Sequence, residues 1–210
     1  MTNPLLDAAY FPPFADIQAD DVIPALDQIL AQNRQAIDSL LQSPPTDWSL
    51  IQQLETIDDR LNQAWSPVSH MNAVVNSDPL REAYNQALPK LSEYHTELGQ
   101  NEQLYKAFRG LADSDGFSSL SGGQRQLVNN ALRDFHLSGI DLSPEDKSRY
   151  GELQKRLSEL SSQFSENVLD ATQAWHKRFD TADELAGLPE NTLALAAQTA
   201  KEKGLDGYVV

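Results

Sequence analysis

Apolar residues recur every three or four positions along most of the chain, which is the spacing that places side chains on one face of an α-helix. The first run is typical: Val22, Leu26, Ile29 and Ile37 follow one face, with a polar interruption at Asn33. The same period predicts helices over about 20–40, 50–68, 80–98, 102–111, 127–135, 144–175 and 189–203. We therefore expect a mainly α protein, built as an array of antiparallel helices.

Prolines interrupt three of these predicted helices. Pro24 is acceptable if it lies in the first turn of a helix that starts at Asp20 and Asp21, because the first-turn N–H groups have no partner within the helix. Pro67 and Pro89 fall inside the second and third helices, where each removes a backbone hydrogen bond and crowds the preceding turn. We expect these two helices to be kinked.

The segment from about 144 to 175 predicts one very long helix. Ser143 is a suitable N-cap, and Pro144 suits the first helical position. Its apolar positions step by three and four: Tyr150, Leu153, Leu157, Leu160, Phe164, Val168, Ala171 and Trp175. We expect this seam to be buried against neighbouring helices.

The pattern changes after Trp175. Residues 176–179 predict a short extended segment, 182–185 a helical turn, and 189–203 a last helix that Gly204 ends. The final residues, 205–210, are typical of the opening of a strand, which needs a partner either in the extended segment or outside the chain. We divide the chain into a helical domain, 1–175, and a second part, 176–210, of extended segment and short helices.

Composition and charge limit the partners. The 210 residues include 31 acidic and 16 basic side chains, a formal charge of −15, with 40% hydrophobic residues and no cysteine. This charge argues against a nucleic-acid backbone as partner, and no apolar run approaches the roughly 18 residues of a membrane span. Without cysteine there are no disulfides, and the start of the chain lacks the pattern of a secretion signal. We expect a cytoplasmic protein that binds neither nucleic acid nor membrane.

One short motif suggests nucleotide binding. Residues 120–124, Leu-Ser-Gly-Gly-Gln, match the signature loop of ATP-binding-cassette ATPases. That chemistry also needs a phosphate-binding loop with a Gly-Lys pair, and the chain contains no such pair. Ser121 followed by Gln124 is equally a capping box at a helix start, and we favour this interpretation.

Metal-binding and catalytic motifs are missing from the sequence. His70, His95, His136 and His176 are far apart, and the zinc motif His-Glu-x-x-His does not occur. The segment 113–116 faintly resembles a calcium loop, but the twelfth position holds glutamine where a glutamate ligand is needed. We therefore assign no catalytic residue, no metal ligand and no cofactor to this chain.

Several stretches, in order and along the whole chain, carry a resemblance to a known family. They are 3–6 with 11–14, WSPVSHMNAVVNS (65–77), LREAYNQALPKLSEY (80–94), LYKAFRGL (104–111), NALRDFHLSGIDLSPEDKSRY (130–150) and 160–175. Together they resemble the amino-terminal portion of the thimet-oligopeptidase family of zinc metallopeptidases, and its bacterial members most of all.

The resemblance implies a helical shell around a deep channel that admits short unfolded peptides. Members of the family are several times longer, and their zinc-binding helix lies beyond the equivalent of Val210. It follows that this chain would be a non-catalytic fragment that supplies part of the channel wall, while the intact enzyme would use zinc to hydrolyse short peptides. A cut between domains can also leave apolar surface bare, so a homodimer formed through that surface is a further expectation.

The channel face is predicted at the proline-bent part of the second helix. The candidate wall residues are Trp65, Ser66, Ser69, His70 and Asn72, because a bent helix with polar side chains suits a wall better than a core. The alternative is an ordinary kink packed against the third helix. A second reading of the whole chain, from a different class, is a free-standing helical module that docks a protein partner and has no peptidase role.

Overall fold

The computed structural model describes residues 3–7 and 11–210 and is mainly α-helical, as predicted. The α-helices are α1 (Ala19–Leu41), α2 (Ser49–Val74), α3 (Asp78–Gly99), α4 (Glu102–Ala112), α5 (Gly122–Leu137), α6 (Pro144–Ala174) and α7 (Glu190–Glu202). Short 3-10 helices are η1 (Pro4–Leu6), η2 (Asp115–Ser119) and η3 (Ala182–Leu185), and the strands are β1 (Arg178–Phe179) and β2 (Tyr208–Val209). The residues form two compact units, Met1–Leu160 and Ser161–Val210, which divide within α6.

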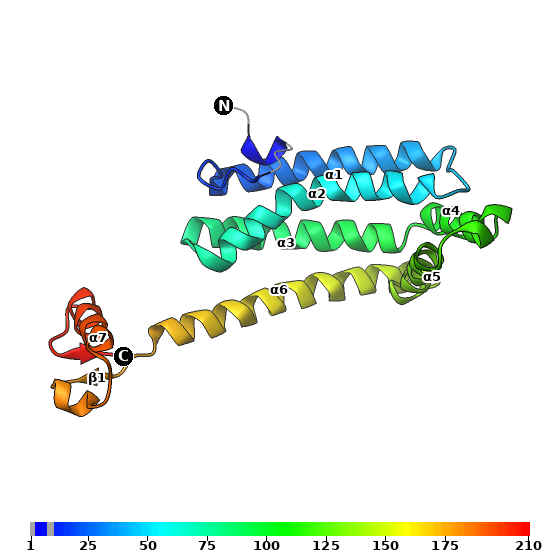
Figure 1. Ribbon diagram of the computed structural model, residues 1–210. Helices are drawn as coiled ribbons and strands as arrows, with labels where there is room; N and C mark the ends of the chain where they lie inside the picture. Colours follow the sequence, from blue (N-terminus) through cyan, green and yellow to red (C-terminus); the bar gives the residue numbers. More distant parts are fainter. Residues whose placement is uncertain (1–2, 8–10) are drawn as a thin grey trace. The chain divides into compact units, whose positions relative to one another are not determined.

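In the first unit, α1, α2 and α3 lie side by side in an antiparallel array, and α4 packs on α5 at one end of it (Figure 1). Large side chains with almost no exposed surface fill the core, among them Ile29, Leu50, Tyr94, Leu111 and Val128. They come from all five helices, so the burial of apolar surface holds these elements together. Ion pairs on the surface add little to the stability of the array.

The helices run through the internal prolines. α2 continues past Pro67 and α3 past Pro89, and Figure 1 shows α2 changing direction along its length, from a part beside α1 toward α3. The prediction for Pro24 is wrong in detail. α1 begins at Ala19, and the Asp21 carboxylate accepts a hydrogen bond from the Gln18 amide at 2.9 Å, so Pro24 is the sixth helical residue and lies beyond the first turn.

The prediction of a buried seam on α6 is also wrong. No residue of α6 is buried, and Leu153, Leu157, Leu160, Phe164 and Val168 are exposed. The start of this helix agrees with the sequence, since the Asp146 amide donates to the Ser143 hydroxyl at 3.1 Å. The period of the sequence establishes that the helix has an apolar face. It does not supply a neighbour to cover that face.

The second unit contains the end of the chain. β1 and β2 pair antiparallel, with Arg178 opposite Val209 and Phe179 opposite Tyr208, so the last residues take the first of the two partners that the sequence left open, the extended segment. The helix α7 ends near Gly204, whose φ of +68° is the left-handed conformation expected after a helix end. Among the described helices, none is both long enough and apolar enough to cross a membrane.

Candidate functional site

The five predicted wall residues lie on two faces of α2. Trp65, Ser69 and Asn72 are half-buried, at steps of four and three, whereas Ser66 and His70 are exposed on the adjacent face. The structure therefore brings the first three together along one line and presents the other two to solvent. A single surface that contacts substrate through all five is not formed.

Two aromatic contacts position this segment. The ring of Trp65 stacks on Tyr84 of α3, with centroids 5.0 Å apart and an angle of 18° between the planes. The imidazole of His70 lies against Phe14, at 5.7 Å between centroids. The contact of Trp65 with Tyr84 agrees with the alternative interpretation, in which the bent part of α2 simply packs against α3. This contact does not involve the polar side chains next to Trp65, which could still face a channel.

Asn72 has an unusual environment. Its side-chain oxygen Oδ1 is buried, and it accepts no hydrogen bond from any of the residues that the structure describes. A buried acceptor without a donor costs about 1–3 kcal/mol. Of the five predicted residues, Asn72 is therefore the one whose buried hydrogen-bonding group has no partner among the described residues.

A groove of about 480 Å³ lies between α2 and α3 on one side and the first half of α6 on the other. It is lined by Trp65, Leu88, Leu91, Ser92, His95, Thr96, Ser138, Tyr150, Gln154, Leu157 and Ser158. The Tyr150 hydroxyl donates to the carbonyl of Leu137 at 3.5 Å, which holds the start of α6 near the end of α5. The groove thus combines apolar walls with uncharged polar groups and one histidine.

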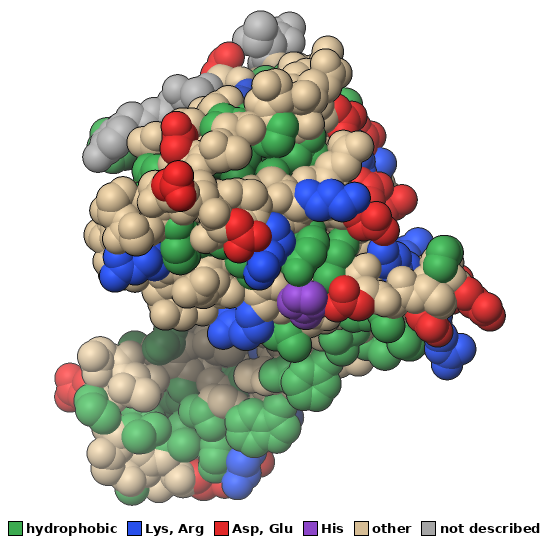
Figure 2. Space-filling model, turned by 90° about the vertical axis from the view of Figure 1, so that its right-hand side faces the viewer, with side chains coloured by type: hydrophobic (Ala, Val, Ile, Leu, Met, Phe, Trp, Pro, Cys, Tyr) green, Lys and Arg blue, Asp and Glu red, His purple; other side chains and the backbone are tan. Residues whose placement is uncertain are grey.

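A second hollow, of about 360 Å³, lies where five helices meet, and its walls are mostly apolar. It is lined by Ile37, Leu54, Ile57, Asp58, Tyr94, Leu98, Gly99, Leu104, Phe108, Ala131, Asp134, Phe135 and Ser138. Burial raises the pKa of the Tyr94 phenol above its usual value. Figure 2 shows the end of the first unit that carries α4 and α5, where hydrophobic side chains lie between acidic and basic ones.

The described residues hold no group of three or more His, Cys, Asp or Glu side chains that could bind a metal ion. The nearest approach to a catalytic arrangement is at the end of α5. There the Nδ1 of His136 contacts the carboxylate of Asp141, and its Nε2 lies 3.3 Å from the Tyr105 hydroxyl. The His136 and Asp141 side chains are exposed, Tyr105 is half-buried, and none of the three lines either hollow. The residues present therefore do not fit a zinc ion, and we derive no reaction step through one.

The loop that matches the nucleotide signature is a helix cap. The Gln124 amide donates to the Ser121 hydroxyl at 3.3 Å, and the Ser121 amide donates to the Gln124 side chain at 2.9 Å. These are the two reciprocal bonds of a capping box. Arg125 donates to the carbonyls of Ser118 and Leu120, which closes the loop on itself.

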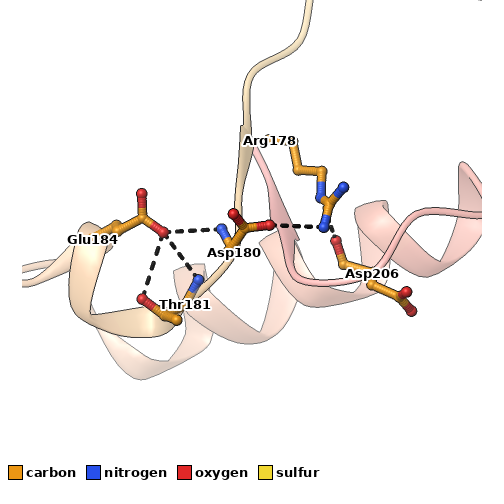
Figure 3. A network of polar contacts seen from close by, with 5 residues as sticks. All are labelled: Arg178, Asp180, Thr181, Glu184 and Asp206. Carbon is orange, nitrogen blue, oxygen red and sulfur yellow. Dashed lines mark hydrogen bonds and ion pairs between the residues drawn. The ribbon is translucent and has the colours of Figure 1, made fainter.

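A polar network in the second unit stabilises its hairpin (Figure 3). Arg178 donates to the Asp206 carbonyl at 2.9 Å and to the Asp180 carboxylate at 2.7 Å. The Glu184 carboxylate accepts from the amides of Asp180 and Thr181, at 3.0 and 3.1 Å. All five residues bond to one another or to the backbone, so the network holds the turn between β1 and η3.

Sequence reasoning did not find most of the groove. Of its lining residues only Trp65 was predicted, while His95 and Tyr150 come from two other helices. The sequence did contain one indication of these two residues, namely their position beside an apolar stripe. His95 directly follows the buried Tyr94, and Tyr150 begins the apolar stripe of α6, so both lie at the border of a helix face. Periodicity places a residue at such a border without identifying the helix that faces it.

Comparison with known proteins gives a consistent result. Residues 26–147 match the family model described as "Neurolysin/Thimet oligopeptidase, N-terminal domain". The chain is 50% identical to oligopeptidase A of Haemophilus influenzae in an alignment that covers 99% of the chain. It is also 50% identical to oligopeptidase A of Escherichia coli, in an alignment that covers 100% of the chain. A probable cytosolic oligopeptidase A of Arabidopsis thaliana is 35% identical over 97% of the chain. The chain spans 31% of each of the two bacterial relatives and 29% of the plant one.

Proposed function

Since this chain belongs to the neurolysin/thimet oligopeptidase family, we propose that it is the non-catalytic, amino-terminal helical part of a zinc-dependent oligopeptidase that hydrolyses short peptides. The observation that carries the proposal is the identity of 50% to oligopeptidase A over essentially the whole chain, which nevertheless corresponds to 31% of those relatives. The remaining length of such a protein is where we place the zinc site and the catalytic groups.

The distribution of chemistry supports this division of roles. The 210 residues contain no His-Glu-x-x-His motif, and their four histidines are far apart. The groove between α3 and α6 has polar and apolar groups but no charged side chain. Such a surface suits contact with a peptide backbone and uncharged side chains rather than catalysis of its hydrolysis.

In the intact enzyme, this part contributes to the wall of the substrate channel. The wall segment is α2 from Trp65 to Asn72, and the groove that Trp65 shares with α3 and α6 extends it. A channel walled by rigid helices admits short unfolded peptides and excludes folded proteins by size. The lack of cysteine and the cytosolic plant relative support action in a reducing cytoplasm.

The first test measures whether the 210-residue chain hydrolyses peptides by itself. Quenched fluorescent peptides are incubated with the 210-residue protein and added zinc, and we expect no hydrolysis above the rate in buffer. As a control, full-length oligopeptidase A of Escherichia coli must cleave the same peptides. Turnover by the chain, removed by a chelator, would show that it is catalytic and refute the proposed role.

The second test addresses the wall. The chain is joined at Val210 to the remaining part of Haemophilus influenzae oligopeptidase A, and peptide cleavage is compared for His70→Ala and Ser69→Ala. We expect kcat/KM to fall by about tenfold, which corresponds to about 1.4 kcal/mol of lost transition-state interaction. His136→Ala, at the far end of α5, is the matched control and leaves cleavage unchanged. Equal effects of His70→Ala and His136→Ala would contradict the wall assignment.

A further inference from the structure

The helix α6 carries a continuous row of exposed apolar side chains, which we call the α6 ridge. Its members are Leu153, Leu157, Leu160, Phe164, Val168 and Trp175, with exposed fractions between 44 and 70%. Single exposed apolar residues are common on protein surfaces, but here five large ones follow one face of α6 and Trp175 comes directly after its last residue. Such patches mark surfaces that another structure covers.

The spacing of the ridge indicates the shape of its partner. Its positions, with Ala171 included, step by 4, 3, 4, 4, 3 and 4, which is an eleven-residue repeat of about 3.67 residues per turn. This period is close to that of a straight α-helix, so the ridge stays on one side for roughly 33 Å. A pair of identical helices wound as a left-handed coiled coil requires a period of 3.5 instead. The ridge therefore does not fit a left-handed coiled coil with a second copy of the same helix.

The charges along α6 also point to burial of its second half. From Pro144 to Leu160, 8 of 17 residues are charged, whereas from Ser161 to Ala174 only Glu166 and Asp170 are charged. Depletion of charged residues is the compositional signature of the centre of an interface. No basic residue lies in this second half, which argues against an anionic membrane surface as the partner.

The length of the relatives indicates which structure could cover the α6 ridge. The chain corresponds to 31% of oligopeptidase A, so about two thirds of such a polypeptide lies outside it. We propose that the α6 ridge is the surface on which this remaining, catalytic part of the polypeptide packs, through an apolar face with few charges. The proposal rests on the proposed function, because it takes the chain to be one part of a longer oligopeptidase.

The test compares the same substitutions in two contexts. Leu153→Ser with Phe164→Ser is introduced into the 210-residue chain and into the chain joined at Val210 to the remaining part of Haemophilus influenzae oligopeptidase A, since Leu153 does not line the groove. Because the side chains are exposed in the chain alone, we expect its Tm to shift by less than about 1 °C. In the longer polypeptide we expect a fall of more than about 5 °C, since the same side chains are then buried. Leu195→Ser, on α7 and 62% exposed, is the matched control with little effect in either context.

Hydrogen exchange gives a readout that does not depend on the variants folding. In the unsubstituted proteins, we expect amides of 161–174 to exchange at least about tenfold more slowly in the longer polypeptide than in the chain alone. Equal exchange and equal Tm shifts in the two contexts would overturn the proposal. So would a homodimer of the chain that the double substitution dissociates while the longer polypeptide is unaffected, since the second copy would then be the occupant.

These readouts are separate from peptide cleavage. If the longer polypeptide protects α6 but the wall substitutions leave cleavage unchanged, the ridge assignment stands and the wall assignment fails. If cleavage depends on the wall residues while the amides of α6 exchange equally fast in both proteins, the wall assignment stands and the ridge assignment fails.

Discussion

Removal of the Ser121 hydroxyl tests directly what the Leu-Ser-Gly-Gly-Gln loop does. In the structure this hydroxyl accepts one bond, from the Gln124 amide, and Ser121→Ala deletes that acceptor. The reciprocal bond, from the Ser121 amide to the Gln124 side chain, does not involve the hydroxyl and remains available. The substitution therefore removes half of the capping box at the start of α5.

The size of the effect follows from the geometry. Loss of an N-cap side chain costs about 0.5–2 kcal/mol. The bond that is lost is long, 3.3 Å, and exposed to solvent, so we expect the low end, about 0.5–1 kcal/mol. For a unit of this size, 1 kcal/mol corresponds to about 2–4 °C in Tm, and the expected decrease is therefore about 1–4 °C.

Urea unfolding followed by circular dichroism measures this change. Ser165→Ala is the matched control. Its hydroxyl donates to the Ser161 carbonyl inside α6, where alanine is the better helix former, so stability is expected to be unchanged or slightly increased. Gln124→Ala completes a double-mutant cycle, in which the two capping substitutions should be non-additive. Additive effects, or no effect of Ser121→Ala, would refute the capping account. Saturable ATP binding that Ser121→Ala abolishes would restore the nucleotide interpretation.

Three further predictions concern the core, the hairpin and one buried phenol. Leu50 has no exposed surface, so Leu50→Ala should lower the free energy of unfolding by about 2–5 kcal/mol in urea, whereas exposed Leu195→Ala should change it by less than about 0.5 kcal/mol. Gly207 has a φ of +90°, and a side chain there would meet the Phe179 carbonyl, so Gly207→Ala should speed amide exchange across β1 and β2; unchanged exchange would contradict this. Burial raises the pKa of Tyr94, so an absorbance titration should show a tyrosine that ionises above the usual pH and is missing in Tyr94→Phe. Because the unfolded chain releases that proton first, Tyr94 contributes stability that is lost as pH rises above about 10, and Tyr94→Phe should weaken this pH dependence.

Much of the fold was predictable because helices are specified locally. The apolar period, the capping residues and the breaks placed every α-helix, and the box at Ser121 and Gln124 formed as expected. The start of α1 was missed by a small margin, because the helix begins at Ala19, where the Asp21 carboxylate accepts from the Gln18 amide, and Pro24 then falls in the second turn. The pairing of β1 with β2 could be stated only as one of two alternatives, since a strand of two residues carries almost no pattern.

The candidate site was harder to predict than the elements that form it. The residues of α2 could be chosen for their polarity and their proline, yet Trp65 turned out to stack on Tyr84 and to share a groove with His95 and Tyr150. Those contacts join residues that are 19 to 85 positions apart in sequence. No short-range pattern encodes them, because each helix reveals its own apolar face and not the helix that will lie against it.

The amino-acid sequence by itself determined the helical class and most of the helix ends, because capping bonds, turn residues and periodicity act over a few neighbouring positions. The tertiary structure decided which faces became buried. α1 and α6 carry apolar stripes of similar regularity, yet the stripe of α1 is buried against α2 and α3, whereas that of α6 is exposed. The physical reason is that burial is a property of two surfaces, and a sequence pattern describes only one of them.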